Sequence, residues 1–351
     1  MKVFGGAQTP LTPAAIEEAA AALQQGGLVA FPTETVYGLG ADGLNAAACR
    51  RIYLAKGRPS DNPLILHIAG LEMLPQIAAE IPPAAQKLMA AFWPGPLTLV
   101  FPKTPAVPLS VTGGLDTVAV RFPSHPVAQV LIRAAGCPVA APSANTSGRP
   151  SPTRAAHVAE DLGEKIDYLL DGGPCSVGVE STIVDVTGPV PTLLRPGGIT
   201  LEMLRQVVGR VDIDPAILDK PDPTLRPKAP GMKYKHYAPS CPVILVKGPP
   251  EAVVAAINAR CKDKRAGVLC TDETAGRYRA ALVRSLGKRD DLEEVARELF
   301  DGLRSLDEAG AEIIFCEVFP QTGTGLAVMN RLQKAAGYTW LDAEAEPGGE
   351  A

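Results

Sequence analysis

The chain has 351 residues, of which 46% are hydrophobic and 21% charged, with a formal net charge of −4. These values are ordinary for a globular protein of about two domains, and the negative charge argues against a broad electrostatic surface for nucleic acid. MKVFGGAQTP at the N-terminus lacks the apolar core of a secretory signal, and no apolar run reaches the ~18 residues of a membrane helix. Seven scattered cysteines without a CxxC pair indicate free thiols. We therefore expect a cytoplasmic protein.

The first 200 residues predict strands interleaved with helices. Thr12 and Pro13 are typical of a helix start, and Gly26-Gly27 of its end. A buried strand at 27–31 follows, and a helix is expected near 124–135. Further short apolar segments, bounded by Gly and Pro, lie at 97–102, 117–123, 137–145, 167–173 and 181–186. This alternation predicts an α/β sheet.

The pattern changes after residue 200. Residues 212–240 hold six prolines and no sustained period, which predicts a linker. A cleaner alternation follows and predicts a small three-layer βα domain. Its expected strands are 243–248, 267–270 and 312–319, and its expected helices are 251–260, 274–285, 291–308 and 324–336.

Several common chemistries lack their sequence signals. GLGADG (38–43) matches the dinucleotide pattern GxGxxG, but PTETVY separates it from the preceding strand, so its glycines are expected to serve a tight turn. No GxxxxGK[ST] loop and no GxSxG elbow occur, and the four histidines lack the spacing of metal ligands.

A local design recurs instead: a strand end, then a proline-stiffened turn that carries hydroxyls or a cation. Strand ends of an open α/β sheet meet at one crevice, and fixed cations with hydroxyl donors suit phosphate recognition and phosphoryl transfer. The side chains concerned are Thr33, Thr35, Lys56, Arg58, Thr117, Arg121, Ser143, Asn145, Ser147, Ser151, Ser181, Thr182 and Arg195.

The motifs that carry these residues resemble, in order, those of the YrdC domain. They are PTETVYGLG, KGRPSDNPLILH, WPGPLT, VAVRFPSHP, PSANTSGRPSPT, GVESTIVD and LLRPGG. PGMKYKHYAP and the domain after it resemble the Sua5 extension, so the chain is similar to Sua5-type threonylcarbamoyl-AMP synthases over about residues 10 to 340.

The resemblance implies an α/β fold with a YrdC-like twisted open sheet and a concave active-site face over residues 9–200. It implies a linker at 201–240 that folds over the active site, and a smaller Rossmann-like βα domain at 241–343. It further implies a nucleotidyltransferase that makes threonylcarbamoyl-AMP and pyrophosphate from L-threonine, bicarbonate and ATP, with Mg²⁺. The product would serve the N6-threonylcarbamoyl modification of adenosine 37 in tRNAs that read ANN codons, and tRNA and the threonylcarbamoyl-transferring complex are possible partners.

Site residues carry over from the matching motifs. Lys56 and Arg58 would be catalytic and would neutralise charge on ATP. Arg121 suits the carboxylate of threonine, and Thr33 and Ser181 suit its hydroxyl and amine. The ATP set is completed by Asn62, Thr117, Ser143, Asn145, Ser151, Arg195, Tyr234 and Tyr237, and the threonine set by His67 and the backbone of Ala141.

The linker is unusually aromatic and basic at Lys233–Tyr237. We expect Tyr237 or Tyr234 to reach the nucleotide and to shield the labile adenylate from water. One position departs from the family pattern: Asn330 stands where Asp is expected, in the second domain and away from the chemistry.

Two alternatives belong to other classes. A non-catalytic module for double-stranded RNA or tRNA would bind in a strongly salt-dependent manner, but the acidic net charge argues against it. A dehydrogenase would require the dinucleotide motif in its proper context. The related domain of hydrogenase maturation has zinc-finger cysteines that this chain lacks.

Overall fold

The computed structural model shows two compact units, one formed by residues 1–147 and 151–234 and one by residues 148–150 and 235–351. It describes residues 1–6, 11–217, 227, 229–230, 236–262 and 264–345. Tyr234 lies outside the described residues. No helix in the described ranges is both long and apolar enough to span a membrane.

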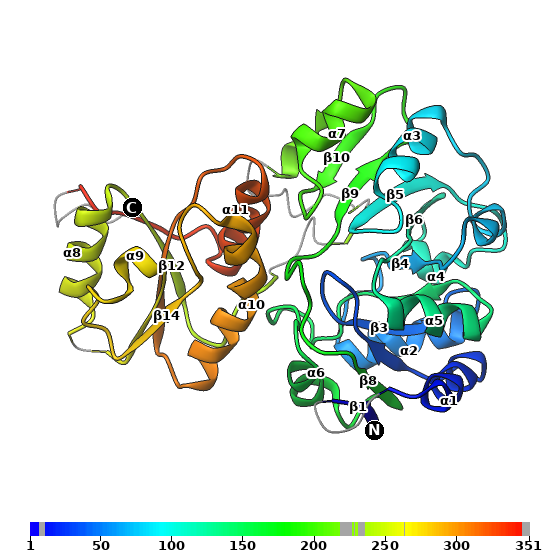
Figure 1. Cartoon of the computed structure of the whole chain (residues 1–351), viewed down its shortest axis with the longest axis horizontal. Coiled ribbons are helices and arrows are strands. Elements are labelled where there is room, and N and C mark those ends of the chain that lie inside the picture. Colours follow the sequence, from blue (N-terminus) through cyan, green and yellow to red (C-terminus); the bar gives the residue numbers. More distant parts are fainter. Residues whose placement is uncertain (7–10, 218–226, 228, 231–235, 263, 346–351) are drawn as a thin grey trace. The chain divides into compact units, whose positions relative to one another are not determined.

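The first unit is built on a mixed, twisted sheet in which the described residues contribute eleven strands (Figure 1). Parallel and antiparallel pairs alternate irregularly, and the central pairs β4/β6 and β5/β9 are parallel. The strands, in their order across the sheet, are β1 (Lys2–Gly5), β8 (Tyr168–Asp171), β2 (Val29–Phe31), β3 (Gly38–Asp42), β7 (Val139–Ala140), β4 (Ile65–His67), β6 (Thr117–Arg121), β5 (Leu97–Pro102), β9 (Thr182–Asp185), β10 (Thr192–Arg195) and β11 (Asp212–Ile213).

Helices cover this sheet, and the first is the one predicted. The side chain of Thr12 caps α1 (Pro13–Gln24) by accepting a hydrogen bond from Ala15 N at 3.2 Å, and Gly26 follows its end with φ of +81°. Helix α1 packs against α5 (Pro126–Ala135) over the core around Phe31. The other helices of this unit are α2 (Ala46–Lys56), α3 (Pro83–Phe92), α4 (Leu109–Thr112), α6 (Ala155–Leu162) and α7 (Leu201–Val208), with short 3₁₀ turns at Leu71–Gln76 and Pro215–Ile217.

The glycines of GLGADG do not serve a tight turn, so that prediction is wrong. Gly38 and Gly40 lie within β3, which pairs antiparallel with β2. A Cβ on Gly40 would meet the Phe31 ring at 2.8 Å and the Val139 side chain at 2.9 Å. The glycines are needed for close packing, and only Gly43 lies in the turn that follows.

The segment predicted as a linker from residue 201 begins with regular structure. Helix α7 is capped by Thr200 and buries Leu201 and Leu204, and β11 adds to the sheet beside β10. Farther on, Ala229 is fully buried in a cluster with apolar residues of the sheet. The apolar spacing of 201–208 explains the helix, since one buried stripe is enough to hold it on the sheet.

The second unit contains a parallel sheet to which the described residues contribute five strands, in the order β14-β13-β15-β12-β16 (Figure 1). This agrees with the predicted Rossmann-like βα architecture. The elements are β12 (Val243–Lys247), α8 (Pro250–Arg260), β13 (Ala266–Cys270), α9 (Asp272–Ala275), β14 (Leu282–Ser285), α10 (Leu292–Glu308), β15 (Ile313–Glu317), α11 (Thr324–Ala335) and β16 (Trp340–Asp342).

One helix prediction in this unit is wrong. Residues 274–285 do not form a helix, because α9 stops at Gly276 and Leu282–Ser285 form the edge strand β14 against β13. Pairing with the edge of the sheet overrides the local spacing of Ala and Leu.

Candidate active site

Lys56 of the KGRP motif contacts the PSAN motif, so the two motifs predicted to bind the nucleotide lie side by side. It is the last residue of α2, its side chain is buried, and its ammonium donates to the backbone carbonyls of Ser143 and Asn145. Ser143 Oγ in turn donates to Asn145 Oδ1. These two carbonyl oxygens fix the position of the ammonium beside the loop of Ser143 and Asn145.

The loop after Lys56 is held rigid by its own backbone. Arg58, half-buried, donates from Nε to Asn62 O at 3.2 Å and from Nη2 to Pro63 O at 2.9 Å. Asn62 is 1% exposed, and its Oδ1 receives no hydrogen bond from the described residues. Such a buried acceptor requires a partner, and a ligand hydroxyl or amine would satisfy it.

Register places the predicted residues at two ends of one strand. Strand β4 is parallel to β6, with His67 opposite Arg121 and Ile65 opposite Ala119. Thr117 lies four residues before Arg121, which is about 13 Å along the strand. It is therefore level with the loop of Arg58 and Asn62, and not beside Arg121.

Arg121 lies at the centre of a buried polar cluster. Its Nη1 donates to Thr35 Oγ1 at 2.8 Å, its Nη2 forms an ion pair with Glu34 Oε1 at 2.7 Å, and its Nε donates to Gly95 O at 3.4 Å. Burial alone would raise the pKa of Glu34, but the charge and hydrogen bonding of Arg121 outweigh it and hold that pKa below its ordinary value.

Thr33 belongs to the same cluster. Its Oγ1 donates to Val36 O at 2.7 Å, so the contact of 2.9 Å between the hydroxyls of Thr33 and Thr35 is donated by Thr35. The hydroxyl proton of Thr33 is thus already used in a hydrogen bond to the backbone. Its Oγ1 also accepts longer hydrogen bonds from Thr35 N at 3.2 Å and Val36 N at 3.3 Å, so a ligand amine or hydroxyl that binds this oxygen replaces one of these contacts.

His67 lies beside Arg121 as a neutral imidazole. Its side chain is buried, Nδ1 is 3.2 Å from Ile65 O, and the ring packs edge-on against Phe31. Burial, reinforced by the charge of Arg121, lowers the pKa of His67 to about 3. The side chain therefore adds a hydrogen-bonding group to this end of the site and no charge at neutral pH.

Ser181 adjoins this cluster from the other side of β5. Its Oγ is 2.7 Å from Thr98 Oγ1, and Thr98 is the register partner of Arg121. Arg195 donates to Ser181 O at 3.0 Å and to Ser181 Oγ at 3.1 Å, and from Nη1 to Pro230 O at 3.3 Å. Ser181 thus contacts Arg195 directly and contacts Thr98, the strand neighbour of Arg121. The sequence assigned Arg195 to ATP and Arg121 to threonine.

Ser151 and Ala141 complete the set in the first unit. Ser151 is buried and donates to Glu180, the neighbour of Ser181. The backbone of Ala141 donates to Ile65 O at 2.9 Å, which places it against β4 between the two ends of the site. The predicted residues Thr33, Lys56, Arg58, Asn62, His67, Thr117, Arg121, Ala141, Ser143, Asn145, Ser151, Ser181 and Arg195 are therefore linked by direct contacts or by register across β4, β5 and β6.

The face of the sheet that carries these side chains is partly covered. Side chains alternate between faces along a strand, so Ile65, Ala119 and Val100 share a face with His67, Arg121 and Thr98. Ala229 packs against this apolar row. Ala229, in the segment predicted as a linker, therefore lies on the face of the sheet that carries His67, Arg121 and Thr98.

Tyr237 is placed differently from the other predicted residues. It belongs to the second unit, where it is 5% exposed and its ring centre lies 5.2 Å from that of Phe300 and 5.8 Å from the Arg331 guanidinium. Its contact with a nucleotide stays a prediction.

Sequence reasoning missed three buried side chains of the site: Glu34, Thr98 and Glu180. For Glu34 a signal was present, since PTET sets a carboxylate between two threonines directly after a buried strand. Isolated acids are almost never fully buried unless paired. Its pairing with Arg121, 87 residues away, could not be read from spacing.

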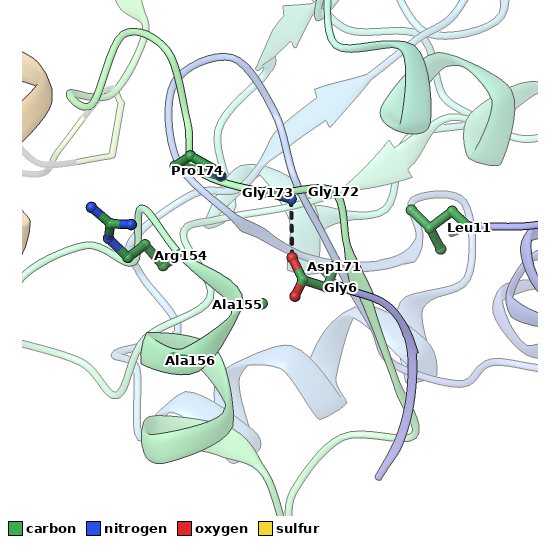
Figure 2. Close-up of a pocket in the computed structure, with 9 residues that line it drawn as sticks. All are labelled: Gly6, Leu11, Arg154, Ala155, Ala156, Asp171, Gly172, Gly173 and Pro174. Carbon is green, nitrogen blue, oxygen red and sulfur yellow. Dashed lines mark hydrogen bonds between the residues drawn. The ribbon is translucent and has the colours of Figure 1, made fainter. Parts of the chain in front are cut away.

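A cavity of about 600 Å³ lies elsewhere in the first unit, and none of the predicted residues lines it (Figure 2). Its wall includes Arg154 at the start of α6 and the turn Asp171–Pro174, in which Gly173 N donates to Asp171 Oδ1 at 3.0 Å. Among the described residues, no group of three or more His, Cys, Asp or Glu side chains could hold a metal ion.

Two family models match this chain and meet near residue 198, ahead of the boundary at residue 235 between the two units. The family described as "Telomere recombination", of the Sua5, YciO and YrdC proteins, matches residues 21–197, and the "Threonylcarbamoyl-AMP synthase, C-terminal domain" family matches residues 199–337. The fold and site thus define a YrdC-type α/β domain joined to a Sua5-type second domain.

Relatives match along nearly the whole chain. Threonylcarbamoyl-AMP synthase of Bacillus subtilis is 52% identical over 92% of this chain and 93% of its own length, and that of Pyrococcus abyssi is 53% identical over 92% and 94%. The crystal structure of P. abyssi Sua5 complexed with L-threonine superposes with a TM-score of 0.90 at 49% identity, covering 97% of this chain and 98% of that one. The chain belongs to the Sua5 family of threonylcarbamoyl-AMP synthases.

Proposed function

We propose that this protein is an L-threonylcarbamoyladenylate synthase, which converts L-threonine, bicarbonate and ATP to threonylcarbamoyl-AMP and pyrophosphate. One observation carries the proposal: the loop of Arg58 and Asn62 lies before β4 and level with Thr117, and the polar cluster around Arg121 lies at the other end of the same strand pair. Thr117 and Arg121, which mark these two ends on β6, are about 13 Å apart along the strand. A reaction between an amino acid and the α-phosphate of ATP requires this arrangement.

The amino-acid end accounts for each group of threonine. The second protons on Nη1 and Nη2 of Arg121 suit the carboxylate. The hydroxyls of Thr33 and Ser181 suit the amine and the hydroxyl of threonine, which would replace the long backbone contacts of Thr33. His67 and the backbone of Ala141 close the site. Neutral His67 leaves the amine without a competing positive charge.

In the reaction, the nitrogen of threonine becomes carboxylated by bicarbonate with loss of water. An oxygen of that carbamate then attacks the α-phosphorus of ATP, a P–O bond forms, and the bond to the β-phosphate breaks to release pyrophosphate. Lys56, Arg58 and Arg195 counter the negative charge that develops, together with the Mg²⁺ of ATP. Little covalent help is needed, because position and electrostatics lower the barrier.

Orientation of the nucleotide falls to the polar residues around Lys56. Asn62 offers a buried acceptor, Ser143 and Asn145 form the loop that binds the ammonium, and Thr117 is level with that loop. Ser151 lies beside Glu180 at the edge of the set. Contacts of Tyr234 and Tyr237 with the nucleotide remain part of the proposal.

Covering of the site by the linker is supported by Ala229 and by the hydrogen bond from Arg195 to Pro230. Excluding water would protect the labile adenylate. If Tyr237→Ala leaves both ATP affinity and product lifetime unchanged, that tyrosine takes no part in the cover. We further propose that the product serves tRNA threonylcarbamoylation at adenosine 37, with the transferring complex as partner, and that the enzyme works in the cytoplasm, where ATP and reduced thiols are available.

The deciding experiment is to incubate the purified protein with ATP, Mg²⁺ and bicarbonate, with and without L-threonine, and to measure pyrophosphate. We expect release that depends on both L-threonine and bicarbonate. Release that ignores threonine would contradict the proposal.

A further inference from the structure

Glu34 has no role in the reaction described above, although it is one of the most buried charges in the first unit. It is 6% exposed, and its Oε2 also accepts a hydrogen bond from Ser124 N at 3.2 Å. A buried carboxylate is costly unless it is paired and hydrogen-bonded. Its partner is Arg121, the side chain that we assign to the carboxylate of threonine.

The contacts of Arg121 fix the orientation of its guanidinium. Nε and Nη1 donate hydrogen bonds to Gly95 O and Thr35 Oγ1, and Nη2 lies 2.7 Å from Glu34 Oε1 in an ion pair without hydrogen-bond geometry. A guanidinium carries five N–H groups, so Nη1 and Nη2 each retain a second proton. Two protons are what a carboxylate needs for bidentate binding.

Glu34 also sets the charge of this end of the site. Glu34 and Arg121 cancel, His67 is neutral, and Thr33 and Thr35 carry no charge. Arg195 reaches Ser181 from the far side, where we place the nucleotide. A site whose own charges cancel accepts a zwitterion, whose carboxylate and ammonium lie close together. An arginine without Glu34 would instead favour a simple anion such as bicarbonate or pyrophosphate, both of which are present in the reaction.

We propose that Glu34 and Thr35 are positioning residues for Arg121, and that the carboxylate of Glu34 makes the site select a zwitterionic amino acid over a carboxylate anion. This inference rests on the proposed function. It assigns a specificity role to two residues that need not touch the substrate.

Three ligands separate charge from position: L-threonine, (R)-3-hydroxybutyrate, which lacks the amine, and L-threoninol, which lacks the carboxylate. Their dissociation constants are measured by calorimetry, so turnover is not required. In Glu34→Gln we expect (R)-3-hydroxybutyrate to gain affinity and L-threoninol to lose it, each by about ten-fold or more, because a unit charge about 6 Å away in a partly buried site is worth that much. L-threonine, which carries both charges, should change less than either analogue.

Thr35→Val is the matched control, because it removes a hydrogen bond to the guanidinium and leaves every charge in place. We expect L-threonine and (R)-3-hydroxybutyrate to weaken by the same factor, about ten-fold, and L-threoninol to weaken less, because Thr35 reaches it only through Thr33. Thr35→Ser, which keeps the hydroxyl, should recover the affinity that Thr35→Val loses.

Equal effects of Glu34→Gln on all three ligands, or no effect on any, would overturn the inference. Melting curves monitor folding. If Glu34→Gln does not fold, Glu34→Asp, which moves the carboxylate away by one methylene, must change the dissociation constants in the same directions and by smaller factors. A wild-type protein that binds L-threonine and releases no pyrophosphate would refute the proposed reaction and leave this inference standing. Absence of L-threonine binding would refute both.

Discussion

In the proposed mechanism, Arg58 serves catalysis more than stability. Arg58 is half-buried and makes its hydrogen bonds to two carbonyls of its own loop. Its guanidinium is therefore held in position by short-range contacts, and its removal opens no cavity in the core.

We expect Arg58→Ala to lower threonine-dependent pyrophosphate release by about 10² to 10³, the usual cost of losing one group that stabilises developing charge. Its melting temperature should stay close to that of the wild type, since such surface contacts contribute little. Arg50→Ala, on the exposed side of α2, the helix that precedes this loop, is the control and should keep full activity. A large drop in the melting temperature of Arg58→Ala would argue for a structural role.

The buried imidazole of His67 makes stability depend on pH. Its folded pKa is about 3, whereas an unfolded histidine titrates near 6.5. Below pH ~6.5 the unfolded chain takes up a proton that the folded protein refuses, so stability is present above that pH and is lost as pH falls toward 3. At pH 5 the loss from this one residue is about 2 kcal/mol.

Urea unfolding at pH 7.5 and pH 5 measures this effect. We expect the wild type to lose more stability between the two values than His67→Gln, which cannot titrate. If the two proteins show the same difference, His67 does not contribute to the pH dependence.

At the scale of elements, the first unit depends on close approach between neighbouring strands. Strand β3 runs between β2 and β7, and the Phe31 ring of β2 lies over Gly40. Phe31 also contacts His67 edge-on. The glycine in β3 thus allows the aromatic packing that backs the amino-acid end of the site.

Gly40→Ala places a Cβ 2.8 Å from the Phe31 ring, and we expect a loss of about 1–3 kcal/mol, as for other overpacked cores. Gly276→Ala is a suitable control, because a Cβ there meets no atom within 4 Å and the backbone has an ordinary φ of −71°. Denaturant titration of both variants tests this. Equal stability would mean that β3 moves aside without cost.

At the scale of the whole molecule, the segment that follows β11 packs back against the large sheet. Ala229 is fully buried against Ile65, Val100 and Ala119, and Arg195 donates to Pro230. These contacts of Ala229 and Pro230 place the connecting segment next to the proposed site.

Ala229→Asp would place a charge in this apolar cluster and should release the segment from the sheet. We expect the variant to consume ATP with less threonylcarbamoyl-AMP accumulated per pyrophosphate, because water reaches the adenylate. Quantifying both products in the same reaction is the measurement, and Ala216→Asp, at a position only partly buried beside the cluster, is the control. An unchanged ratio in Ala229→Asp would show that the segment does not exclude water.

Sequence alone established the α/β architecture, the parallel second sheet and the family, because strand periodicity and ordered motifs are local properties of the chain. It also named the Lys56 and Arg58 pair and the strand-end hydroxyls. Contacts between distant segments were decided by tertiary structure: Glu34 finds Arg121 only when β2 and β6 share a sheet, Lys56 binds the carbonyls of a loop about 90 residues away, and Leu282–Ser285 becomes a strand only beside β13. Burial and pairing depend on which segments fold together, and no spacing along the chain encodes them.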